Sequence, residues 1–127
     1  MTDNMIELAK RAVACKGWRW SSGMLWLVKR AAPLEDYAGR AVLGYTRPHE
    51  ALPVLTDAAT VGCLLALVRS AYSDPWFYVR PSHTYRPDGV LGWECFGYLP
   101  GRDGGSWRGS GYASEAEALV DALEAAP

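Results

Sequence analysis

The segment at residues 55–72 constrains the fold most, because it joins helix-start signals to an almost unbroken apolar run. Thr56 is expected to cap a helix through its side-chain oxygen, with Asp57 in the first turn, where a negative charge suits the helix dipole. Every residue from 61 to 68 except Gly62 is apolar. An apolar surface around most of a helix is typical of burial on more than one side. The run is too short for a bilayer, which takes about 20 apolar residues. We therefore expect a central helix packed on a sheet and flanked by another helix.

Gly62 interrupts this apolar run. We expect its missing side chain to allow a neighbouring backbone to approach closely. The alternative is a tolerated glycine, which costs about 1 kcal/mol relative to alanine inside a helix.

Three cysteines, Cys15, Cys63 and Cys95, are widely spaced along the chain. An odd number at such spacing argues against a disulfide framework and favours a reducing compartment. Their apolar surroundings predict buried, unreactive thiols. Residues 1–16 are amphipathic and charged, unlike a secretory signal peptide. We therefore expect a cytoplasmic protein.

The composition bounds the class of protein. A chain of 127 residues suits a single domain, here residues 1–127, and its 50% hydrophobic content is sufficient for a core. The formal net charge of −1 gives no general attraction to nucleic acid or to a membrane surface. Six Trp and seven Tyr can fill a core or anchor an interface, and composition does not separate the two uses.

Two further helices are expected, one at each end of the chain. Asp3 or Asn4 can cap the first, which has an apolar face at steps of three and four residues. The members of that face are Met5, Leu8, Ala9, Ala12 and Cys15. Ser114 and Glu117 form a capping box for the last helix, with Ser114 as the cap and Glu117 reaching back to its N–H.

The remaining chain reads as short strands separated by polar turns. The expected strands are 18–20, 24–28, 40–46, 76–80, 90–99 and 107–112. The expected loops are 29–39, 47–53, 81–89 and 100–106. Short connections favour antiparallel pairing. The sequence therefore predicts an α+β domain in which one mainly antiparallel sheet carries three helices as a layered α/β sandwich.

Three stretches carry a resemblance to a known family. They are Leu-Thr-Asp-Ala-Ala-Thr-Val-Gly-Cys-Leu-Leu-Ala-Leu-Val-Arg at 55–69, the opening from Ile-Glu-Leu-Ala at 6–9 to Gly-Trp-Arg-Trp at 17–20, and Ser-Glu-Ala-Glu-Ala-Leu at 114–119. Together they resemble the phage α-β-α sandwich domain family, small proteins encoded by phages and prophages. The resemblance implies a phage origin and a sandwich fold. It implies no catalytic residues, because the family has no established activity.

Motifs for catalysis, metals and cofactors are not recognised. His49 and His83 lie far apart, and no cysteine pair has the spacing of a zinc site. Cys63 could meet either histidine in space, but an apolar helix is a poor setting for a nucleophilic thiol. The glycines at 101–105 lack the strand–loop–helix context of a phosphate loop. We therefore expect no catalytic residue, no metal and no cofactor.

The best surface candidate is the connection at residues 80–86. Arg80, His83, Tyr85 and Arg86 place two guanidinium groups, an imidazole and a phenol on one turn-rich segment. Such a set can contact a protein, stack and pair with nucleic acid, or remain a solvated loop.

Together these features predict a non-enzymatic phage accessory protein of the host cytoplasm. It would act by contact with a partner protein, for example as an inhibitor of a host defence protein. A weak nucleic-acid binder that uses residues 80–86 and a small enzyme without a recognised motif are the alternatives.

Overall fold

A computed structural model describes residues 1–44, 46–97 and 109–127 of the chain. Within these residues the helices are α1 (Asp3–Ala14), α2 (Ala58–Ala71) and α3 (Glu115–Glu124). The strands are β1 (Leu25–Val28), β2 (Tyr37–Arg40), β3 (Leu52–Pro53), β4 (Tyr78–Tyr85), β5 (Leu91–Phe96) and β6 (Gly109–Tyr112). None of the helices in this part of the chain has the length and apolar character that crossing a membrane requires.

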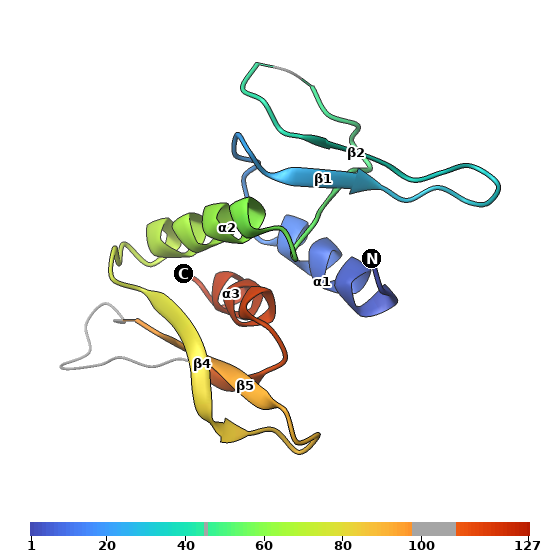
Figure 1. Cartoon of the computed structure of the whole chain (residues 1–127). Helices are drawn as coiled ribbons and strands as arrows, with labels where there is room; N and C mark the ends of the chain where they lie inside the picture. The colour runs from blue at the N-terminus through green and yellow to red at the C-terminus, as the bar shows by residue number, and fades with distance from the viewer. Residues whose placement is uncertain (45, 98–108) are drawn as a thin grey trace.

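The strands form two small antiparallel sheets, with the orders β2-β1-β3 and β4-β5-β6. Figure 1 shows the three helices between the two sheets, with β1 and β2 on one side and β4 and β5 on the other. The predicted α+β class, with three helices and antiparallel strands, is confirmed. The strands divide into two sheets rather than one, because α2 carries the chain across the helical layer before β4 begins.

The core lies where the helices meet. All three helices contribute, and α3 buries the most positions: Ala116, Ala118, Leu119, Val120, Ala122 and Leu123. Leu64, Leu67 and Val68 of α2 pack into the same core, and the Tyr72 hydroxyl donates to the Ala122 carbonyl oxygen at 2.7 Å. The centre of the protein is thus a packed helical layer, and each sheet covers one side of it.

The central helix is less enclosed than its sequence predicts. Gly62 and Ala66 are exposed, and an added Cβ at Gly62 would meet no atom within 4 Å. The prediction of close packing at Gly62 is therefore wrong. Cys63 is half-buried instead of fully buried, as is Cys15, while Cys95 has no exposed surface. Small apolar residues cost little in water, so their presence in the run did not require burial.

The helix caps differ from prediction at two of three starts. Thr2, not Asp3 or Asn4, caps α1, and Asp57, not Thr56, caps α2 by accepting from Thr60 N at 3.0 Å. Ser114 caps α3 as predicted, since its Oγ accepts from the Glu117 N–H at 3.1 Å. The Glu117 carboxylate accepts from the N–H of Ala113 rather than from that of Ser114.

Several strand boundaries also differ from the predicted ones. Residues 18–20 form no strand, and β2 ends at Arg40, where a strand had been expected to begin. Pairing with β1 determines the bounds of β2, because the Leu25↔Arg40 and Val28↔Tyr37 pairs set the register of the two strands. Two residues of the expected loop 47–53 form β3. The expected loop 100–106 and the ends of two expected strands lie outside the described residues.

Strand β4 continues to Tyr85, although residues 81–85 had been expected to form a loop. Pro81 lies inside the strand and pairs with Trp93. Because β4 is at the edge of its sheet, one side of the strand needs no ladder hydrogen bonds, which is where proline is tolerated. The hairpin of β4 and β5 is therefore longer than predicted, and it carries most of the predicted site.

Candidate functional site

The four predicted site residues do not form one cluster. Arg80 lies on the outer face of the hairpin, where its Nε donates to Glu94 Oε1 at 2.7 Å. Its guanidinium carbon lies 4.6 Å from the centre of the Phe96 ring, and Tyr78 stacks on Phe96 at 5.3 Å. The hydrogen bond that Arg80 donates to Glu94 raises the pKa of Arg80. The charge of Arg80 is thus compensated within the sheet.

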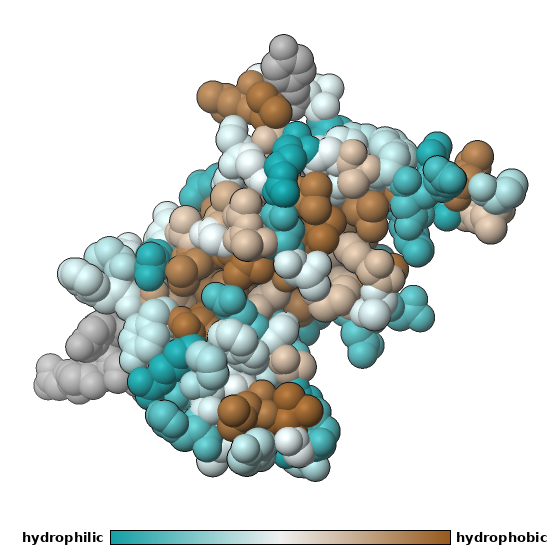
Figure 2. Space-filling model, viewed as in Figure 1, coloured by the Kyte–Doolittle hydropathy of each residue, from teal (hydrophilic) through white to brown (hydrophobic). Residues whose placement is uncertain are grey.

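Tyr85 lies at the far end of the same hairpin. Its side chain is 71% exposed, and it pairs across the strands with Leu91, which is 42% exposed beside Val90 at 59%. Figure 2 shows a hydrophobic patch at the end of the molecule where Figure 1 places this hairpin. We call Tyr85, Val90 and Leu91 the hairpin end. His83 is exposed on β4, before this patch.

Arg86 leaves the outer surface. Its backbone N–H donates to the Val90 carbonyl at 2.8 Å, and its Nη2 lies 3.4 Å from Asp88 Oδ2. The half-buried side chain lines a hollow of about 600 Å³ together with residues of α1 and α3, among them Glu117. Arg86 therefore stabilises the turn and faces the helices, away from Arg80.

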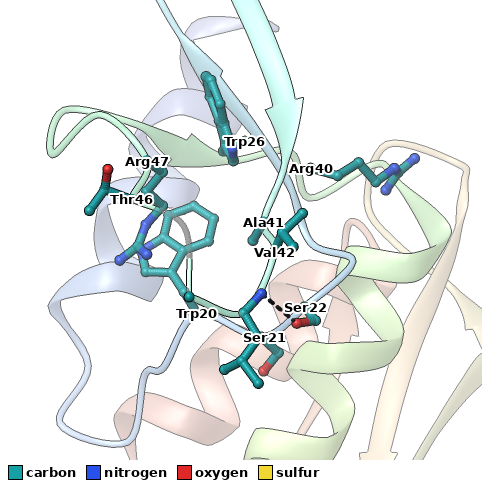
Figure 3. A pocket seen from close by; sticks show the side chains of 11 residues that line it. Trp20, Ser21, Ser22, Trp26, Arg40, Ala41, Val42, Thr46 and Arg47 are labelled. Carbon is teal, nitrogen blue, oxygen red and sulfur yellow. Dashed lines mark hydrogen bonds between the residues drawn. The ribbon is translucent and has the colours of Figure 1, made fainter.

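A second candidate lies on the other sheet, in a hollow of about 230 Å³ that we call the two-tryptophan pocket. Figure 3 shows Trp26 above this hollow, Trp20 at its lower left, and Ala41 and Val42 to its right. The Ser22 side chain accepts a hydrogen bond from Leu43 N at 3.1 Å and so attaches the segment after β2 to the turn before β1. Sequence reasoning did not identify this pocket.

Glycine sets the position of Trp26. An added Cβ at Gly39 would lie 2.7 Å from the Trp26 indole, so the indole lies directly over the β2 backbone. Tyr37 meets the same indole edge-to-face at 5.7 Å. Trp20 is supported in a similar way by Trp18, at 5.4 Å and an interplanar angle of 87°. Both indoles are thus held in place by neighbouring side chains or backbone.

The two arginines of the pocket differ in electrostatic environment. Arg40 donates to both oxygens of Asp57, at 2.7 and 2.8 Å, and this contact holds the pKa of Asp57 well below its usual range. Figure 3 shows Arg40 extending away from the indoles. Arg47 lies 4.3 Å from the centre of the Trp20 ring, and burial lowers its pKa. Among the described residues no carboxylate pairs with Arg47.

Side chains suited to metals or nucleophilic chemistry do not gather in the described ranges. No group of three or more His, Cys, Asp or Glu residues there could hold a metal ion. His49 is fully solvated and pairs with Glu50, and the Cys63 thiol points toward the Ser22 carbonyl at 3.9 Å. Neither candidate surface therefore brings a nucleophile and a base together.

Comparison with known proteins identified no relative that could indicate a role for either surface. A scan against protein-family models and searches of curated proteins and solved structures found no match to this chain. The resemblance to the phage α-β-α sandwich family therefore stays a prediction.

Proposed function

We propose that this protein acts by binding a partner protein through the hairpin end and the adjoining outer face of β4 and β5. The observation that carries the proposal is the exposure of three large side chains, Tyr85, Val90 and Leu91, at one projecting end of the molecule. Exposed apolar side chains gathered in one place mark interaction sites more often than scattered ones do.

The outer face of the hairpin supports the same use. Tyr78, Phe96 and Arg80 form a stacked surface toward the other end of the same hairpin, and Tyr and Arg are among the residues that most often dominate binding energy. The Glu94 contact leaves little net charge on this face. Such a surface fits an apolar, weakly charged patch on a partner better than it fits a polyanion.

The biological setting of this proposal rests on the resemblance described above. A phage accessory protein would meet its partner in the host cytoplasm, where a host defence protein is one target class. The free state of all three cysteines is the state expected in a reducing compartment. Nucleic-acid binding by residues 80–86 receives less support, because Arg80 pairs with Glu94 and Arg86 lies beside Asp88.

The chain offers a matched test. Val90→Ser with Leu91→Ser removes the aliphatic part of the hairpin end, and Val42→Ser with Leu43→Ser makes the same changes on the other side of the molecule. All four side chains are exposed, so both double variants should fold. We expect the first pair to weaken capture of host proteins by at least tenfold, about 1.4 kcal/mol, and the second to leave it unchanged.

Equal capture by both double variants would show that the hairpin end is not the contact surface. Sedimentation of the purified protein distinguishes a self-contact. If the wild type is dimeric and only the Val90/Leu91 variant is monomeric, the partner is a second copy of this chain.

A further inference from the structure

The two-tryptophan pocket combines a shape and a charge that the proposed function does not use. Its volume of about 230 Å³ is small beside drug-sized sites of about 300–1,000 Å³. Trp26 lies above the hollow, Trp20 at its lower left, and Ala41 and Val42 to its right (Figure 3). The space therefore suits one flat ring system rather than an extended molecule.

The charge of the lining indicates the rest of the ligand. The described residues that line the pocket include two arginines and no carboxylate. Arg40 is already bound to both oxygens of Asp57, whereas Arg47 has only the Trp20 ring as a partner among the described side chains. A cation without a carboxylate partner among the described residues attracts an anionic group. The ligand should thus carry a negative charge next to its flat ring.

We infer that the two-tryptophan pocket binds one nucleotide unit, with the base against the Trp20 and Trp26 indoles and the phosphate at Arg47. Bases stack on aromatic side chains with little regard to sequence, and arginine adds both charge and stacking. An aromatic side chain of a peptide would fill the hollow without satisfying Arg47, and inorganic phosphate would satisfy Arg47 without filling the hollow. A base inside a duplex is stacked and paired, so the source is a free nucleotide or a single strand.

The indole N–H resonances of the full chain report on this site directly. We expect UMP to shift the Trp20 and Trp26 signals in a saturable manner, each assigned by a Trp→Phe variant. Trp76 serves as an internal reference, because its side chain is 77% exposed and lies outside the pocket. Uridine should bind at least tenfold more weakly than UMP, and inorganic phosphate should leave both indole signals in place.

A matched pair of variants tests the role of Arg47. Arg47→Gln removes the cation over Trp20, while Arg30→Gln removes an equivalent cation 4.7 Å from the Tyr37 ring and outside the pocket. UMP should bind at least tenfold more weakly to the first variant and unchanged to the second. The dispersion of the same spectra shows that each variant is folded.

Single-stranded oligothymidylate distinguishes the two sources of the nucleotide. Tighter binding than UMP, with an affinity that falls as salt rises, by a slope of about −0.7 per phosphate contacted, would identify a single strand. Equal or weaker binding would identify a free nucleotide. The inference is overturned if neither compound moves the Trp20 and Trp26 signals, if Trp76 moves equally, if phosphate alone reproduces the shifts, or if Arg47→Gln binds UMP as the wild type does.

Discussion

The two sheets are attached to the helical layer by different contacts. The β4-β5-β6 sheet lies on α3, whose buried positions include Leu119, Val120 and Leu123, and it contributes the fully buried Cys95. The β2-β1-β3 sheet also reaches the core, but polar groups tie it to the start of α2. The Asp57 carboxylate accepts two hydrogen bonds from the guanidinium group of Arg40 in β2. The Thr60 hydroxyl accepts one from the N–H of Leu25 in β1 at 2.8 Å.

This difference in contacts predicts which interactions stabilise the hairpin end and which stabilise the two-tryptophan pocket. Apolar packing is insensitive to pH and sensitive to volume, whereas a polar network depends on each partner being present and charged. The hairpin end should therefore depend mainly on the common core, although the Tyr112 hydroxyl of β6 also donates a hydrogen bond to Asp121 of α3. The two-tryptophan pocket lies beside the network of Arg40, Asp57 and Thr60, so its geometry should also depend on those three residues.

The largest effect is expected in the core that both sheets share. Leu119→Ala should lower the free energy of unfolding by about 2–5 kcal/mol, the range for deleting a buried leucine side chain. Both sheets should lose protection from hydrogen exchange together. Urea denaturation checks the magnitude, with the exposed Leu43→Ala as the control. An unchanged midpoint for Leu119→Ala would contradict the common core.

Thr60→Val should have a smaller and more local effect. Valine has nearly the same shape as threonine but leaves the N–H of Leu25 without its acceptor, at a cost of about 1–3 kcal/mol. Hydrogen exchange should accelerate at β1 and β2 more than at β5. Thr56→Val, at an exposed position nearby, is the matched control. If Leu25 keeps its protection in Thr60→Val, the polar tie does not hold this sheet.

Acid should produce a still smaller difference in hydrogen-exchange protection between the two sheets. The hydrogen bond from Arg40, with that from Thr60, lowers the pKa of Asp57 in the folded state. A group with a depressed folded pKa contributes stability above its unfolded pKa, about 3.9 for aspartate, and this is lost as pH falls through the folded value. Below about pH 4, β1 should therefore lose protection before β5 does.

Asp57→Asn provides the control for this acid effect. The variant cannot titrate at residue 57, so any difference in acid sensitivity between β1 and β5 should disappear. A wild type in which both strands lose protection at the same pH would argue against a special role for Asp57.

Local signals in the sequence located the three helices but identified the capping residue of only one of them. The Ser114 cap was predictable because Ser114 and the Glu117 N–H lie within one helical turn. At the start of α2, Thr56 and Asp57 are both suitable caps, and the choice falls on Asp57, which also binds Arg40 from β2. That partner is a tertiary contact, so the sequence around the helix contained no sign of it.

For the candidate sites, too, the sequence predicted local properties but not tertiary contacts. Tyr85 was predicted to be exposed and is, since turn chemistry and exposure are local properties. The separation of Arg80 from Arg86 was not predicted, because the strand was expected to end at Arg80 and instead continues through Pro81 to Tyr85. The pocket required Trp20, Trp26 and Arg47 to lie close together, and no spacing in the sequence indicates that Arg47 lies over the Trp20 ring.

Pro81 has a consequence for how the protein behaves at high concentration. Strand β4 forms one edge of its sheet, and it is the longest strand among the described residues. An exposed edge of this length is a template on which identical chains can add strand to strand and aggregate. Proline has no N–H, so the ladder that an incoming strand would form on β4 lacks a donor at its middle. One imino acid should thus weaken strand addition at this edge while leaving the outer face of the hairpin free for contact.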